Sequence, residues 1–305
     1  MEVQLLKSLS DALYPSQSVH QEKIEGHFGD ALLRPLSPPE QHELNSLDLF
    51  FVVFTNRSGS TYLTELLHLA GAGIHPRAEQ FNESSVLDKV RNESIHTFTD
   101  YVLSSVREQQ ENGRVGFKIS AAQLFWLTRL GFLPNFRSVR LIHSLREDRI
   151  AQAVSHVKAR ATGQWHTLMP LKNSQPVPYS RREMLKCLRG ISRSQELCNY
   201  YSSIHQPPRL DVVYERVLED PYRELQRMAN FLGIAGFRAK RVKLDAVVIQ
   251  QQRDQENERL SNIFKEEFGF TGSCPVSTEG LSAPANLRSR LAARLRTRGL
   301  WQRSR

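Results

Sequence analysis

The residue types best suited to chemistry are concentrated in one short segment, Thr55–Thr61, which reads TNRSGST. It follows an apolar run, Leu49–Phe54, and precedes leucines at helical spacing over 63–70. A strand, loop and helix in this order direct free backbone N–H groups and the positive end of the helix dipole at one spot. The segment therefore predicts an anion site, with an ordinary capped strand-to-helix turn as the alternative. The predicted ligands are Arg57, Ser58, Gly59, Ser60 and Thr61.

The chemistry of this predicted site is narrowed by what the sequence lacks. Gly59 lets a bound group approach the backbone, and the planar fork of Arg57 matches phosphate or sulfate oxygens. A Walker A loop needs a glycine, four residues and then Gly-Lys-Ser/Thr, and no such spacing occurs. An ordinary ATP or GTP site is therefore disfavoured. No His/Cys cluster has metal-ligand spacing, so no metal is expected.

Two further segments supply candidate proton acceptors and a candidate cation. His75 and Glu79 follow a pair of glycines and lie in a segment expected to cross near the carboxyl ends of the strands. Lys118 lies near the end of a predicted strand, 114–119, where its amine could reach the same anion. For each residue an ordinary surface position is the alternative.

A second anion-binding pair is suggested further along the chain. Arg146 stands where the predicted strand 139–143 gives way to a helix, and Ser155 lies inside that helix. Together they could bind a second phosphate, although spacing alone favours an N-terminal turn with ion pairing and a Ser155 that is merely packed. Arg253 is one more candidate anion ligand, with a surface arginine as the alternative.

The elements that must position these residues alternate along the chain. Strand patterns at 49–54, 114–119, 139–143 and 210–214 are separated by helical patterns, which predicts an α/β fold with a parallel sheet flanked by helices. A long proline-containing connection, 163–180, is of the kind that is usually functional or mobile. The predicted organisation is an N-terminal extension, 1–47, a main domain, 48–279, and a basic tail, 280–305.

Composition limits the classes of partner. Of the formal net charge of +9 over 305 residues, seven charges come from arginines of the 280–305 tail, so a nucleic-acid-binding core is not implied. The tail predicts either a disordered basic segment or a helix on an anionic membrane surface. Three cysteines without a CxxC pair suit a reducing compartment. With no secretory or membrane-spanning pattern, a cytoplasmic location is expected.

Taken together, these motifs carry a family resemblance. Four segments appear in the order TNRSGST, HPRAEQFN, GFKI and LIHSLREDRIAQAVSHVKARATGQWH, and a weaker fifth is LDVVYERVLEDPYRELQRMANFLGI. The chain resembles the PAPS-dependent sulfotransferases, most closely the bacterial trehalose sulfotransferase-like family, where PAPS is 3′-phosphoadenosine 5′-phosphosulfate. The resemblance implies a P-loop-like parallel sheet, the sulfotransferase fold.

The resemblance also implies roles for the candidate residues. The loop from Arg57 to Thr61 would bind the 5′-phosphosulfate, and Arg146 and Ser155 the 3′-phosphate. Glu79 falls where the family places a carboxylate proposed as general base, and Arg57 and Lys118 would stabilise the transferred charge. The chain departs from the family at Asn56 and Glu147, and around Glu79, where it has one extra residue.

The expected function is transfer of the sulfuryl group of PAPS to a hydroxyl of a carbohydrate, glycolipid or similar small acceptor. The resemblance further implies a homodimer. Two other classes stay open: a nucleotide-dependent phosphotransferase on a P-loop-like fold, which the missing Gly-Lys-Ser/Thr disfavours, and a non-catalytic adaptor acting through the basic tail.

Overall fold

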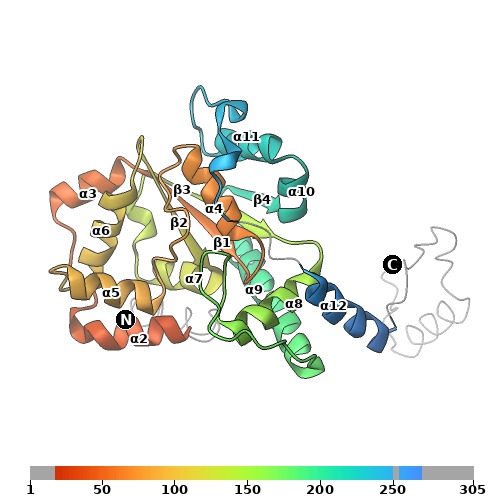
Figure 1. Cartoon of the computed structure of the whole chain (residues 1–305). Coiled ribbons are helices and arrows are strands. Elements are labelled where there is room, and N and C mark those ends of the chain that lie inside the picture. The colour runs from red at the N-terminus through yellow and green to blue at the C-terminus, as the bar shows by residue number, and fades with distance from the viewer. Residues whose placement is uncertain (1–17, 250–253, 270–305) are drawn as a thin grey trace, which may run out of the picture. The chain divides into compact units, whose positions relative to one another are not determined.

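The computed structural model of this chain describes residues 18–249 and 254–269 (Figure 1). The chain splits into two compact units, Met1–Ser261 and Asn262–Arg305, and the sheet and all the predicted site residues fall within the residue range of the first. One of those residues, Arg253, and the 280–305 tail lie outside the described residues. The domain boundaries expected at 47/48 and 279/280 stay predictions.

The centre of the fold is a parallel sheet, as predicted. Among the described residues it has four strands in the order β2-β1-β3-β4. Phe51 of β1 pairs with Phe117 of β2 and with Leu141 of β3, so β1 is an interior strand. The strands are β1 (Asp48–Phe54), β2 (Arg114–Ser120), β3 (Ser138–Leu145) and β4 (Arg209–Val213).

The apolar run of β1 forms a strand because both of its faces are covered. Successive side chains of a strand point to opposite faces. Phe51 therefore lies in one hydrophobic cluster, whereas its neighbours Phe50 and Val52 lie in another. A strand buried on both sides loses the polar–apolar alternation, which is why the sequence shows a continuous run here.

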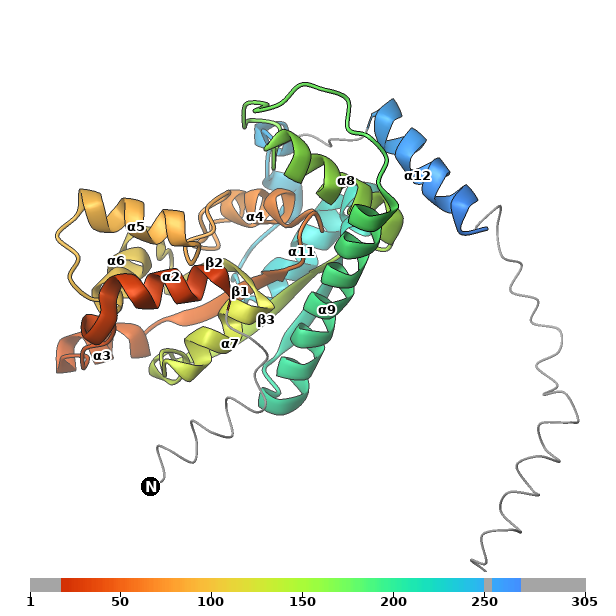
Figure 2. The same cartoon turned by 90° about the horizontal axis from the view of Figure 1, so that it is seen from below.

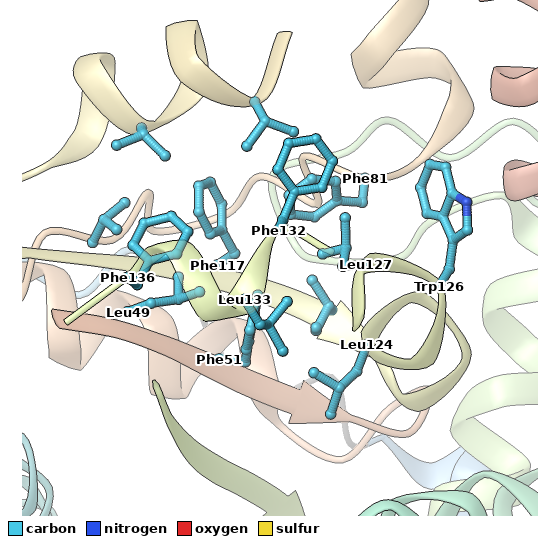
Figure 3. Packing of buried hydrophobic residues seen from close by; sticks show 14 of the residues in the cluster. Leu49, Phe51, Phe81, Phe117, Leu124, Trp126, Leu127, Phe132, Leu133 and Phe136 are labelled. Carbon is cyan, nitrogen blue, oxygen red and sulfur yellow. The ribbon is translucent and has the colours of Figure 1, made fainter. Parts of the chain in front are cut away.

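The larger cluster lies on one face of the sheet. Figure 3 shows Phe51 and Phe117 of the strands together with Phe81, Trp126 and Phe132 from the elements that cover them. Helices contributing to this cluster are α2 (Val19–Phe28), α3 (Pro38–Asn45), α5 (Glu83–Asn92), α6 (Phe98–Gln109), α7 (Ala121–Arg129) and α9 (Arg181–His205).

The opposite face is covered by α4 (Ser60–Leu69), α10 (Tyr214–Glu219) and α11 (Pro221–Phe231). Figure 1 shows α10 and α11 together beyond β4, and Figure 2 shows α8 (Arg149–Thr162) beside the upper part of α9. Of the α-helices that the structure describes, the last in the chain is α12 (Gln255–Glu267), which spans the point where the two units meet in the sequence.

Some elements differ from the sequence expectation. Residues 18–47, for which the sequence predicts only an N-terminal extension, contain two α-helices, and Ser18 caps the first of them. Tyr214, expected to end the fourth strand, instead begins α10. The start of α11 follows from its own residues: Pro221 is the first residue of the helix, and the Asp220 carboxylate caps it by accepting the Arg223 N–H.

Candidate anion-binding site at the carboxyl ends of the strands

The strand order creates a switch point next to β1. From β1 the chain continues to β2 on one side, whereas from β3 it continues to β4 on the other. Open α/β sheets bind ligands outside the carboxyl ends of the strands at such a point. Arg57 follows β1 and Arg146 follows β3, so the two arginines flank it.

The loop after β1 is held in one conformation by its neighbours. Gly59 has a φ of 85°, and a Cβ there would lie 2.1 Å from the ring of Tyr214. Ser58 is fully buried, with its Oγ 3.0 Å from Oγ of Ser144. Gln152 of α8 donates through Nε2 to a hydroxyl and a carbonyl of the same loop, each at 2.8 Å. The loop thus packs against both of the connections that follow β3 and β4.

Arg57 lies at the centre of the first group of charges. Its Nε donates to Oγ of Ser155 at 2.8 Å, and its Nη1 donates to the carbonyl of Trp165. Burial, together with the charge of Arg146, lowers the pKa of Arg57 to about 10. Its backbone φ of 64° is uncommon for a residue with a Cβ. The fold therefore holds this guanidinium against both desolvation and a like charge.

Arg146 lies beside Arg57, and Arg57 in turn contacts Ser155, so the pairing of Arg146 with Ser155 on one phosphate stays a prediction. Nη1 of Arg146 donates to the carbonyl of Arg57 at 3.3 Å, and its guanidinium carbon lies 5.4 Å from the centre of the Tyr214 ring. Glu215 approaches Nε at 3.7 Å, too far for a hydrogen bond. Within the described residues, the buried Nε has no hydrogen-bond partner. An oxyanion would supply the missing acceptor.

A second group of charges lies at the other end of the loop. Lys118 Nζ donates to Oγ1 of Thr61 at 3.0 Å and lies 2.9 Å from Oε1 of Glu79. It also lies 5.1 Å from the centre of the Phe54 ring. Because Lys118 is only 3% exposed, the alternative of an ordinary surface lysine is wrong.

The two candidate proton acceptors differ in what they contact. Glu79 reaches Lys118 with one oxygen and accepts from Nδ2 of Asn82 at 2.7 Å with the other. His75 is exposed, and its Nδ1 accepts the N–H groups of Arg77 at 3.2 Å and Ala78 at 2.9 Å. The lone pair of that nitrogen already accepts hydrogen bonds from the backbone of its own turn. Of the two, Glu79 is the one joined to the charged groups of the loop.

The structure therefore brings the predicted residues together in two adjoining groups. Arg57, Arg146 and Ser155 form one, and Thr61, Lys118 and Glu79 form the other. The loop between them carries the buried Ser58 and Ser60, along with Gly59. Arg253 alone of the predicted ligands falls outside the described residues.

Sequence reasoning missed two residues of this region. Tyr214 lies against Gly59 and Arg146. His166 lies among cationic side chains: burial, followed by the charges of Lys118 and Arg77, lowers its pKa. Both are inside segments that carried the family resemblance. No spacing rule, however, distinguishes them from ordinary aromatic and loop residues.

Two negative findings concern the described part of the chain. No group of three or more His, Cys, Asp or Glu side chains there could hold a metal ion. No helix among the same residues is long and apolar enough to cross a membrane. Cys187 and Cys198 of α9 are buried free thiols.

Comparison with known proteins gives one family match. Residues 129–267, somewhat under half of the chain, match the Stf0 sulphotransferase family. The matched segment includes Arg146, Ser155 and His166 and begins after the loop that follows β1. No curated protein matches the chain.

Three solved structures illustrate the structural similarity. The sulfotransferase domain of the Synechococcus olefin synthase is 14% identical, with 79% of this chain and 99% of that one covered, at a TM-score of 0.38. A mouse sulfotransferase complexed with PAP is 13% identical, covering 84% and 74%, at 0.39. A Mycobacterium tuberculosis sulfotransferase is 13% identical, covering 83% of both chains, at 0.40.

TM-scores this low carry no argument about the site. The α/β fold follows instead from the chain's own parallel sheet and the helices on its two faces. The family match supports the resemblance that the sequence motifs predicted: residues 129–267 of this chain are similar to the Stf0 sulphotransferases.

Proposed function

We propose that this protein transfers the sulfuryl group of PAPS to a hydroxyl of a small acceptor. The observation that carries the proposal is the loop from Arg57 to Thr61. It joins a pair of arginines at one end to a buried lysine and a carboxylate at the other. A donor with anionic groups on both the 5′ and the 3′ positions of its ribose matches such an arrangement, and the family match supports it.

The two ends of the cofactor would bind to different groups. The backbone N–H groups of the loop, with Arg57 and Lys118, would hold the 5′-phosphosulfate. Arg146 and Ser155 would hold the 3′-phosphate. Ser155 already accepts a hydrogen bond from Arg57, and its own hydroxyl proton remains to be donated. The unsatisfied Nε of Arg146 supports the second assignment.

The transfer would proceed by in-line displacement. The acceptor oxygen forms a bond to sulfur while the bond from sulfur to the 5′-phosphate oxygen breaks, leaving adenosine 3′,5′-bisphosphate. By analogy with phosphoryl transfer, positioning and charge stabilisation supply most of the catalysis. Lys118, buried and directed at the start of α4, would stabilise charge on the leaving phosphate and sulfuryl oxygens.

The acceptor hydroxyl loses its proton during the attack, and Glu79 would take it. The ion pair with Lys118 and the hydrogen bond from Asn82 orient this carboxylate. A positioned base contributes roughly 10²–10⁴-fold. The scheme uses no metal ion, and the base and the cation that it needs, Glu79 and Lys118, are already in contact.

The wider setting is also part of the proposal. A carbohydrate or glycolipid is the acceptor class that the family resemblance suggests, in a cytoplasmic homodimer. The arginine-rich tail, 280–305, would at most add a peripheral contact with an anionic membrane surface.

Calorimetric titration without metal tests the cofactor assignment. Adenosine 3′,5′-bisphosphate should bind tightly, whereas AMP and ATP, which lack the 3′-phosphate, should bind much more weakly. A preference for ATP, particularly one that needs Mg²⁺, would replace the proposal with a phosphotransferase. If none of the three nucleotides bound, the proposal would be replaced by a non-catalytic adaptor. After a positive result, labelled PAPS allows acceptors to be screened.

A further inference from the structure

His166 lies on a turn that is braced by its own hydrogen bonds. The Met169 N–H donates to the carbonyl of His166 at 3.0 Å, and Gln164 Nε2 donates to the carbonyl of Met169 at 2.8 Å. The Lys172 N–H closes the turn onto the carbonyl of Thr162, the last residue of α8, at 2.8 Å. Although it begins a long connection, this part of the chain is a defined structure that can hold a side chain in place.

The same turn is attached to the anion-binding loop. Arg57 donates through Nη1 to the carbonyl of Trp165, the residue before His166. The Trp165 ring lies 5.9 Å from the ring of His156 on α8. The backbone next to His166 is therefore fixed at the residue that would hold the phosphosulfate.

The imidazole of His166 faces an excess of positive charge. The charges that act on it are those of Lys118 from β2, Arg77 from the segment after α4, Arg57 from the loop, and Glu65 from α4. Burial, then the three cations, lowers the pKa of His166 below its usual value, so the ring is neutral at pH 7. Glu65 opposes this effect.

Glu65 already has other hydrogen-bond and ion-pair partners. It lies 3.0 Å from Nη1 of Arg77 and accepts the N–H groups of Val248 at 2.9 Å and Ile249 at 3.2 Å. Nδ1 of His166, by contrast, is buried and has no hydrogen-bond partner within the described residues. A buried polar nitrogen without a partner is costly unless a ligand or water completes it. The excess of positive charge around this nitrogen favours an anionic ligand.

We propose that His166 is a ligand of the transferred sulfuryl group, with its buried ring nitrogen donating to a sulfuryl oxygen of PAPS. This inference rests on the proposed function. It is directed at the sulfuryl end because Lys118 and Arg57, the two cations assigned to that end, both act on the ring. A neutral donor there would bind the group without adding a charge to an already cationic cluster.

The test compares two ligands that differ only in the sulfuryl group. PAPS and adenosine 3′,5′-bisphosphate are titrated calorimetrically, without acceptor, into the wild-type chain and into His166→Ala, His166→Gln and His166→Asn variants. We expect His166→Ala to weaken PAPS about 3- to 10-fold, the effect of one neutral hydrogen bond, and to leave the bisphosphate within twofold. His166→Gln, whose amide N–H lies nearer the place of Nε2 than of Nδ1, should recover little of the loss, whereas His166→Asn, whose amide nitrogen lies nearer the place of Nδ1, should recover part of it.

Controls separate this inference from the proposed function. His42→Gln, on the exposed face of α3, should change neither affinity, and thermal unfolding checks that each variant is folded. An unchanged affinity for PAPS in His166→Ala, or equal losses for both ligands, would overturn the role of His166 while the cofactor site stands. Failure of the wild-type chain to bind either ligand would overturn the proposed function and this inference with it.

Discussion

Two arginines of this molecule show opposite uses of the same side chain. Arg34, which precedes α3, donates to both oxygens of Glu40, at 2.9 and 2.7 Å, and through Nε to Asp100 of α6 at 2.7 Å. The hydrogen bonds that it donates to Glu40, and then to Asp100, raise its pKa. Arg57 donates instead to a hydroxyl and a carbonyl, and burial with Arg146 lowers its pKa to about 10.

The difference separates two kinds of charge. One kind stabilises the fold, and the other is kept in place by the fold although burial and a neighbouring charge disfavour it. The charge of Arg34 joins the start of α3 to α6, and its carboxylate partners come with it. The charge of Arg57 is opposed by desolvation and by a neighbour of the same sign. Strain of this kind is characteristic of functional sites, where a ligand offsets it. The following predictions test this comparison, from the largest effect to the smallest.

The largest effect is expected from a carboxylate at the site. Glu79→Gln should lower turnover of PAPS roughly 10²–10⁴-fold because the amide cannot accept the acceptor's proton. Calorimetry should show that binding of adenosine 3′,5′-bisphosphate is kept. Glu40→Gln is the matched control: it removes a carboxylate that pairs with Arg34, and it should cost stability with turnover unchanged. Near-normal turnover in Glu79→Gln would move the base to another group, with His75 the first to test.

The second prediction compares alanine variants of the two arginines, which should have opposite effects on stability and affinity. Arg57→Ala should weaken adenosine 3′,5′-bisphosphate about 10- to 100-fold, since hydrogen bonds to charged groups contribute about 1.5–3 kcal/mol. Its melting temperature should stay level or rise, because a buried charge is removed. Arg34→Ala should do the opposite, with a lower melting temperature and unchanged affinity. If both variants lost stability alike, the distinction between the two arginines would fail.

A third, narrower effect concerns the 3′-phosphate. Arg146→Ala should weaken adenosine 3′,5′-bisphosphate about tenfold or more but leave AMP nearly unaffected, because only the former carries the group assigned to Arg146. The two ligands are titrated side by side. Equal losses would show that Arg146 acts on the 5′ end or on the loop itself, to whose Arg57 carbonyl it donates.

The smallest effect is a pH dependence of the stabilising cluster. Hydrogen bonds from Arg34 and then from the Ser37 N–H lower the pKa of Glu40 to about 2. A depressed carboxylate pKa gives stability that is present above the unfolded value of about 4.3 and is lost as the pH falls towards 2. The stability difference between wild type and Arg34→Ala should therefore shrink between pH 7 and pH 2.5 in denaturant unfolding. A constant difference would show that packing of the arginine stem is what matters.

Local sequence determined much of the scaffold. The apolar run of β1, the polar loop with its glycine and the leucines of α4 identify a strand, loop and helix without any knowledge of distant residues. The strand patterns after it were sufficient for a parallel sheet. The start of α11 is also encoded locally, with Asp220 as its cap and Pro221 as its first residue, because capping depends on residues a few positions apart.

What only the tertiary structure decided concerns contacts between distant segments. Spacing could not tell whether Lys118 was a surface residue; its burial against Thr61 and Glu79 depends on how β2 pairs with β1. Likewise, no residue near His166 in the sequence predicts the cations that act on it, because they come from β2, from the loop and from the segment after α4. Burial and electrostatic fields are sums over the whole fold, so a sequence can name the residues of a site before it can say how they are charged.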